Sequence, residues 1–120
     1  MRPYLEITKF NCEPIGGEVE GFRHYKVQVE IVAFSPQNEL EKGEAKCIHY
    51  GQLIGGTKTE INIFPGIGTI NGSGTCEDPY IVRAEFESAK VPYGLWLCIA
   101  RVVDNKGQEA YVKKGLKVKG

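Results

Sequence analysis

The dominant pattern along the chain is an alternation of apolar and polar residues with a period of two. It is clearest at 22–34, where alternate positions carry apolar side chains: Tyr25, Val27, Val29, Ile31 and Ala33. The same alternation recurs at 80–87, and no window of a dozen residues has the period of an amphipathic helix. Strict alternation is typical of a β-strand with one buried face. The pattern therefore predicts an extended, half-buried chain in both stretches.

Five more stretches complete a set of seven predicted strands: 4–12, 44–50, 58–64, 94–104 and 109–119. Residues that favour turns separate them, at 13–17, 35–38, 51–56 and 104–107. The longest irregular stretch, 65–79, is expected to be a mobile loop. Short strands with frequent turns favour an all-β, two-sheet antiparallel sandwich. We expect one such domain covering residues 1–120.

Composition and charge narrow the function classes. Among 120 residues, 15 are Lys or Arg and 15 are Asp or Glu, so the formal net charge is zero. This balance argues against nucleic-acid binding, which normally needs a basic face. No stretch approaches the roughly 20 apolar residues of a membrane span. The first residues lack the apolar run of a secretory signal, and the sequence leaves the compartment open between a cytoplasmic protein and a surface or secreted module.

Candidate catalytic and metal-binding groups are sparse. His24 falls on the polar side of its predicted strand, where it is expected to be solvated. His49 shares a face with Cys47, but this pair supplies only two of the four ligands that zinc needs. The acidic pairs at 77–78 and 104–105 do not fill the six to eight oxygen positions of calcium. We therefore expect no catalytic site, no metal and no cofactor.

The last third of the chain carries a pattern found in a known superfamily. Residues 94–107, GLWLCIARVVDNKG, resemble G-x-(aromatic)-x-V-x-L-x-V-x-D-N-x-G, the penultimate strand and closing turn of immunoglobulin-like modules. The resemblance is to the polycystic-kidney-disease type and to bacterial surface modules. Gly94, Trp96, Cys98 and Ala100 are also similar to the G-x-Y-x-C-x-A pattern of intermediate-set immunoglobulin domains. The resemblance implies an immunoglobulin-like sandwich of about seven strands with Trp96 facing the core.

The strand order that the resemblance implies places the four cysteines. Cys47 and Cys98 become neighbours on adjacent strands, and they are the pair for which a disulfide is possible. Cys12 and Cys76 are placed at opposite ends of the sandwich, and no bond is expected between them. The second predicted strand has no inward cysteine, so the inter-sheet bridge of antibody domains to Cys98 is not expected.

The predicted strand 94–104 has more apolar residues than one buried face requires. If Trp96 points inward, several apolar residues of this strand and its neighbours point to the outer side: Ile48, Tyr50, Leu95, Leu97, Ile99, Val103 and Tyr111. Exposed apolar patches of a few hundred Å² usually mark a contact surface. These seven residues are the predicted interaction face, for a second copy of the chain or for another protein.

The function predicted from these features is a non-catalytic recognition, adhesion or spacer module that acts through protein–protein contact. One alternative is a stand-alone structural or assembly protein, such as a virion or appendage component. The other is a carbohydrate-binding sandwich, for which the candidate rings are Tyr50, Tyr93, Tyr111 and Trp96.

Overall fold

The computed structural model describes residues 1–20, 22–50, 59–88 and 94–118. They form eight strands: β1 (Tyr4–Val19), β2 (Phe22–Phe34), β3 (Leu40–His49), β4 (Thr59–Phe64), β5 (Thr69–Asn71), β6 (Tyr80–Glu87), β7 (Gly94–Asp104) and β8 (Glu109–Val118). Among the described residues, no helix is long and apolar enough to cross a membrane. The first residue of the predicted strand 58–64, the last residue of the predicted strand 109–119 and the predicted turn at 51–56 lie outside the described residues.

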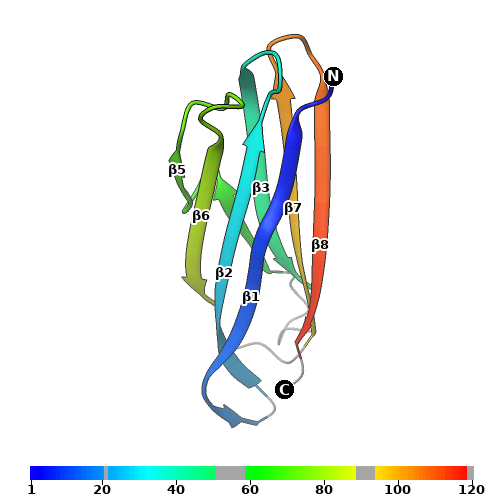
Figure 1. Ribbon diagram of the computed structural model, residues 1–120. Helices are drawn as coiled ribbons and strands as arrows, with labels where there is room; N and C mark the ends of the chain where they lie inside the picture. Colours follow the sequence, from blue (N-terminus) through cyan, green and yellow to red (C-terminus); the bar gives the residue numbers. More distant parts are fainter. Residues whose placement is uncertain (21, 51–58, 89–93, 119–120) are drawn as a thin grey trace.

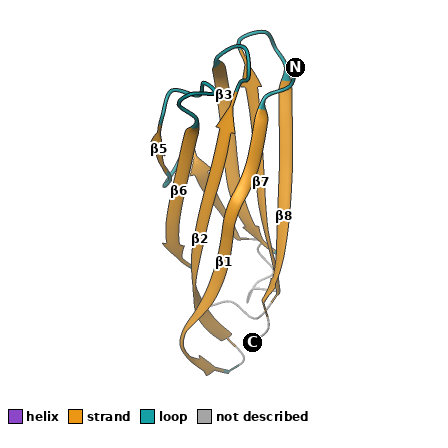
Figure 2. Cartoon of the chain, in the orientation of Figure 1, coloured by secondary structure: helices purple, strands orange, loops and turns teal. Residues whose placement is uncertain are grey.

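The strands form two four-stranded antiparallel sheets with the orders β1-β2-β6-β5 and β4-β3-β7-β8. The sheets pack face to face, and the chain crosses between them after β2, β4 and β6 (Figure 1, Figure 2). The all-β sandwich predicted from the period of two is therefore confirmed. In Figure 1, β1 and β8 run in the same direction, so the start of β1 and the end of β8 lie at opposite ends of the long axis.

The predicted inward faces are also confirmed. In β2, every second residue from Tyr25 onward is buried against the other sheet. In β6, Val82 lies opposite Ile31 and Ala84 lies opposite Val29, so that the apolar stripes of the two strands adjoin. Successive side chains of a strand point to opposite faces of the sheet. The apolar residues at every second position therefore all face the interior between the two sheets.

The structure corrects the number and limits of the strands. There are eight strands, because β5 lies inside the 65–79 stretch that was predicted to be a loop. Its three residues are all exposed and pair with β6, so they show no alternation that could have predicted a strand. β1 continues to Val19, beyond the turn predicted at 13–17, because a register shift and the positive φ of Gly16 (73°) absorb the irregular sequence. β3 begins at Leu40 instead of residue 44.

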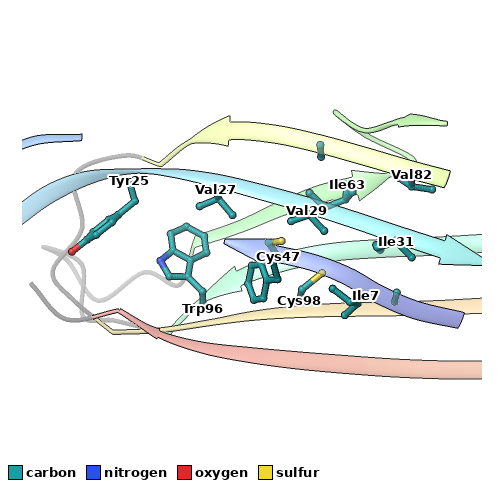
Figure 3. Packing of buried hydrophobic residues seen from close by; sticks show 14 residues of the cluster. Ile7, Tyr25, Val27, Val29, Ile31, Cys47, Ile63, Val82, Trp96 and Cys98 are labelled. Atoms are coloured by element: carbon teal, nitrogen blue, oxygen red, sulfur yellow. The ribbon is translucent and has the colours of Figure 1, made fainter. Parts of the chain in front are cut away.

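The core is filled unequally along its length. At one end the large side chains of Trp96 and Tyr25 are completely buried (Figure 3). His49 is also fully buried, and its ring centroid lies 4.9 Å from that of Trp96. At the other end, residues of both sheets line a cavity of about 360 Å³. Protein interiors are usually packed without such voids, so the two halves of this sandwich differ.

Candidate functional site

The outer face of the β4-β3-β7-β8 sheet carries the predicted interaction residues. Because Trp96 is fully buried in the core, its neighbours on β7 point outward, and Leu95, Leu97 and Ile99 form a row along this strand. On β8, Gly115 lies opposite Leu97. A side chain added at Gly115 would meet the Leu95 Cδ1 atom at 3.5 Å, so the leucine side chains spread over the glycine.

The exposure of these residues divides them into three groups. Tyr111, Tyr50 and Leu95 are exposed, at 59%, 50% and 39%. The others that remain accessible are half-buried: Leu97, Ile99 and Val103. Ile48 corrects the sequence-based expectation, because it lies on the outer side but is only 2% exposed. It lies between Leu97 of β7 and Glu60 of β4, whose long side chains flank it on both sides, and it contributes no contact surface.

Charged pairs border the apolar row. Lys46 of β3 and Glu60 of β4 form an ion pair of 2.8 Å. Further along the face, Arg101 of β7 contacts Glu109 of β8 and lies 3.8 Å from Glu44. These pairs are partly exposed, and pairs of this kind add little to stability. An apolar centre with a charged rim is the composition of a protein–protein interface.

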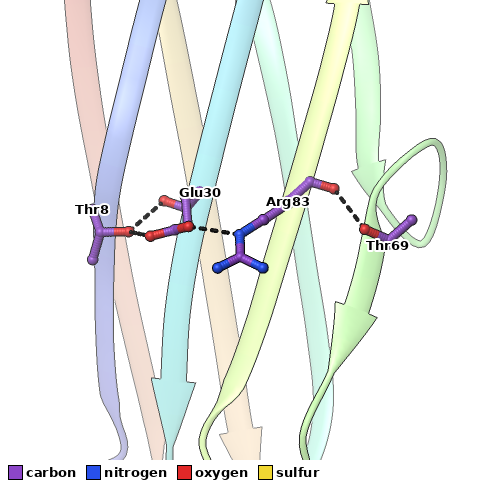
Figure 4. Close-up of polar contacts among 4 residues, drawn as sticks. All are labelled: Thr8, Glu30, Thr69 and Arg83. Atoms are coloured by element: carbon purple, nitrogen blue, oxygen red, sulfur yellow. Dashed lines mark hydrogen bonds and ion pairs between the residues drawn. The ribbon is translucent and has the colours of Figure 1, made fainter.

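The outer face of the other sheet is polar at its centre and apolar at one end, where the Tyr4 and Phe34 rings stack with their centroids 4.9 Å apart. A network of hydrogen bonds crosses all four of its strands: Thr8 of β1 donates to Glu30 of β2 at 2.8 Å, Arg83 of β6 donates to Glu30 at 2.8 Å, and Thr69 of β5 donates to the Arg83 carbonyl (Figure 4). The bonds from Arg83 and Thr8 lower the pKa of the Glu30 carboxyl. The polar side chains at the centre of this face therefore hydrogen-bond to one another, whereas the exposed row of Leu95, Leu97 and Ile99 lies on the other sheet.

The two histidines occupy different surroundings. His49 is fully buried beside Trp96 in the core. His24 is exposed, and its Nδ1 lies 3.0 Å from the carbonyl oxygen of Ser88. Among the described residues, no group of three or more His, Cys, Asp or Glu side chains is arranged to hold a metal ion.

The cysteines are four free thiols, and their positions follow the strand register. Cys47 of β3 lies directly opposite Cys98 of β7, as expected. The N–H of Tyr50 donates to the carbonyl of Leu95. Since hydrogen-bonded and non-hydrogen-bonded pairs alternate along an antiparallel ladder, Cys47 and Cys98 form a non-hydrogen-bonded pair, whose Cα atoms are about 4.5 Å apart. This separation lies within the range for a disulfide, and a bond between them stays a prediction.

The other two cysteines lie apart from each other. Cys12 is half-buried against the main core cluster, opposite Val27 of β2. Cys76 is exposed and follows Thr75, which bridges to Ser35 at the far end of β2. Val27, opposite Cys12, and Ser35, which bridges to Thr75, are eight residues apart along the chain, which corresponds to roughly 26 Å of strand.

Burial and hydrogen bonding make Cys47 and Cys12 poor nucleophiles. The hydrogen bond with Cys47 lowers the pKa of Cys98, but Cys98 is fully buried and no reagent reaches it in the folded protein. The hydrogen bond to Cys98 and burial raise the pKa of Cys47 far above that of an ordinary thiol. Burial raises the pKa of Cys12 to about 11. Because only the thiolate reacts, and only where a reagent can reach it, these groups stay inert in the folded protein.

We expect the native protein to show one fast-reacting thiol, Cys76, when it is titrated with Ellman's reagent at pH 7.5. Addition of denaturant should release the remaining three. A Cys76→Ser variant should lose the fast phase and keep the slow one, because the exposed thiol is removed and the core is unchanged. A fast phase that persists in this variant would show that the core opens readily.

Asp104 is a buried carboxylate that accepts hydrogen bonds from the closing turn and from the Asn38 side chain. It accepts hydrogen bonds from the backbone N–H groups of Lys106 and Gln108, at 2.9 and 2.8 Å, and from the Gln108 side chain at 3.2 Å. Burial alone would raise its pKa, but the hydrogen bonds from Gln108 and Lys106 outweigh it, and the pKa is lowered. Asp104 therefore holds the β7–β8 turn.

Comparison with protein-family models, with curated proteins and with solved structures finds no match for this chain.

Proposed function

We propose that this chain is an immunoglobulin-like module that acts through protein–protein contact and has no catalytic role. The strand orders support the immunoglobulin-like class: with β1 to β8 read as A, B, C, C′, D, E, F and G, the sheets are ABED and C′CFG. Immunoglobulin sandwiches are built from an ABED sheet and a CFG sheet, to which other sets add C′. The residues 94–107 that carry the sequence resemblance form β7 and its closing turn.

The observation that carries the proposal is the difference between the two outer faces. The centre of one face is crossed by hydrogen bonds and an ion pair, and Tyr4 stacks on Phe34 at its end. The other face presents Leu95, Tyr50 and Tyr111 at the surface, with half-buried apolar neighbours and ion pairs at the border. Exposed apolar rows of this kind favour contact with another protein surface. A second copy of the chain is the simplest partner, because its own row is available for a two-fold symmetric contact.

The proposal predicts reversible self-association that depends on Leu95. In sedimentation velocity over a concentration series, the wild-type protein should shift from monomer to dimer. Leu95→Lys should stay monomeric, because a charge in the exposed part of the row would be buried without a partner. Ile15→Lys is the matched control, since Ile15 is 37% exposed and lies on β1, in the other sheet; it should associate like the wild type.

A wild-type protein that remains monomeric at the highest soluble concentration would contradict the self-association. Equal association of the Leu95→Lys and wild-type proteins would contradict the choice of face. The same face would serve a stand-alone assembly protein, and the oligomer formed in this experiment would then be its building unit.

The aromatic residues give less support to carbohydrate binding. Trp96 is fully buried, and Tyr93 lies outside the described residues. Tyr50 lies opposite Leu95, and Tyr111 lies opposite Arg101. Six residues of β7 separate these two levels, which is about 20 Å of strand. The two exposed tyrosines are too far apart to stack on one sugar ring.

A further inference from the structure

The cavity between the sheets opens at the edge of β3. Its walls are mainly apolar side chains from both sheets, among them Leu5, Ile31, Val82 and Val102. Exposed residues that also line it are found in 41–44 of β3 and at Ile70 of β5, and Phe64 lines it as well. Its volume of about 360 Å³ lies within the range of roughly 300–1,000 Å³ that is typical of binding pockets.

Small residues at the inward positions of β3 leave this space. Gly43 and Ala45 occupy the inward positions in this half of the strand, whereas Cys47 and His49 occupy those in the other half. The residue opposite Ala45 on β7 is also small, Ala100. The hollow half of the core therefore follows from the side chains that β3 and β7 present to it.

The edge of β3 is open beside this cavity. β4 pairs with β3 only between Ala45 and His49. After Phe64 the chain turns away, because the N–H of Gly68 donates to the carbonyl of Ile63 at 2.8 Å. Within the described chain, residues 41–44 have no neighbouring strand on this side. A second hollow, of about 340 Å³, lies against the same four residues and reaches the outer-face residues Arg101 and Val103.

The register shows which backbone groups face the open edge. The hydrogen bond from Tyr50 to Leu95 fixes the alternation along the β3–β7 ladder. By that alternation, Gly43 and Val102 form a non-hydrogen-bonded pair. The N–H and C=O of Gly43 therefore point away from β7, toward the open edge. On the cavity side, a Cβ at Gly43 would lie 3.5 Å from both the Phe64 ring and Val102, so the Phe64 ring borders the entrance.

We propose that this edge binds an extended peptide segment of a partner protein, antiparallel to β3, with a large apolar side chain opposite Gly43 that enters the cavity. Adding a strand to an open edge supplies backbone hydrogen bonds, and a pocket for alternate side chains supplies specificity. Gly43 offers the hydrogen-bonding groups, and the cavity beside Ala45 and Ala100 offers the space. Its lining is apolar enough to bury the inserted side chain.

The charges on the edge determine the peptide sequence and its direction. Lys42 and Glu44 are exposed and flank Gly43 on the outer side. In antiparallel pairing, the peptide residue before the apolar one lies opposite Glu44, and the residue after it lies opposite Lys42. Opposite charges in such cross-strand pairs stabilise the sheet. The preferred segment is therefore basic, large apolar, acidic, and the parallel orientation would place like charges together.

This site goes beyond the proposed function, because it is an edge and a cleft, whereas the interaction face is the outer surface of the sheet. Leu95, Tyr50 and Tyr111 do not line the cavity. The two proposals can therefore fail independently.

The test uses a fluorescently labelled peptide, Lys-Leu-Glu-Val-Ser, and fluorescence anisotropy with the full chain. The central leucine of the Lys-Leu-Glu triplet lies opposite Gly43, and the peptide ends before Ala45, where β4 pairs with β3. Binding should saturate, and the peptide with Lys and Glu exchanged should bind roughly tenfold more weakly. Methylation of the central leucine nitrogen should abolish binding, because its N–H donates to the Gly43 carbonyl in the proposed pairing. The Gly43 amide should gain protection from hydrogen exchange when the peptide is bound.

A double variant, Lys42→Glu with Glu44→Lys, gives the decisive comparison. Both side chains are exposed, so the fold should be retained, and the variant should prefer the peptide with exchanged charges. Lys114→Glu, an exposed change on β8, is the control and should keep the wild-type preference. Ala100→Leu should fill the cavity and weaken binding of both peptides, with a melting curve to confirm folding.

Absence of saturable binding at millimolar peptide would overturn the proposal. So would equal binding of the two peptides by the wild-type protein, or an unchanged preference in the double variant.

Discussion

Replacing Trp96 with alanine should lower the free energy of unfolding by about 4 kcal/mol, because it empties the largest fully buried site in the core. A domain of this size usually has a free energy of unfolding of only about 5–15 kcal/mol, so the substitution should remove a large share of the total stability. Urea unfolding followed by circular dichroism is the suitable measurement. Trp96 is the only tryptophan of the chain, and fluorescence would be lost in the variant.

Two further variants distinguish burial from other effects of the change. Leu95→Ala, one position earlier and facing the outer surface, should cost less than about 1 kcal/mol. Trp96→Phe should cost clearly less than Trp96→Ala, since it keeps a ring in the site. It also removes an indole N–H that has no acceptor among the described residues, and a buried N–H of that kind is itself costly. Equal losses for Leu95→Ala and Trp96→Ala would contradict the packing described for β7.

Replacing Asp104 with asparagine should lower the melting temperature by about 10 °C. Asparagine can keep its one oxygen for the N–H groups of Lys106 and Gln108, which both donate to Oδ1. Its NH2 group would replace Oδ2 and face the Gln108 Nε2 donor, and the charge that strengthens all three hydrogen bonds would be lost. Asn105→Ala is the control, because that side chain is exposed in the same turn. A loss in Asn105→Ala as large as in Asp104→Asn would contradict the role given to the carboxylate.

The pH dependence of the same residue has a definite sign. The pKa of Asp104 in the folded protein lies below its ordinary value of 3.8. The folded state therefore holds the carboxylate more readily than the unfolded state, and the stabilisation is complete above the ordinary value. It is lost as the pH falls below 3.8 and through the folded pKa. Melting curves from pH 5 to pH 2 should fall less steeply for Asp104→Asn than for the wild type.

The sequence predicted the fold best where a strand has one solvent-exposed face and one buried face. Residues 22–34 alternate without interruption, and β2 covers the same residues. The position of Cys47 opposite Cys98 also followed from the expected strand order. In both cases the prediction depended on local period and on pairing between long strands, which leave little freedom of register.

Features that depend on the partner strand could not be predicted in this way. β5 is three residues long and exists because β6 offers it an edge. Ile48 has the outward position predicted for it, but its burial depends on the side chains of neighbouring strands. The cavity behind Gly43 likewise results from small residues on β3 and β7 meeting in space. Gly43 lies outside the predicted strand 44–50, so the only signal within that strand was a small residue, Ala45, at an inward position.

The opposite placement of the start of β1 and the end of β8 has a mechanical consequence (Figure 1). Tension applied between these two points acts along the strands, at right angles to the hydrogen bonds that join β1 to β2 and β8 to β7. Such bonds are loaded in shear and must yield together, whereas a hairpin pulled open from one end loses them singly. Within a longer assembly, this sandwich would serve as a stiff link that transmits force without lengthening.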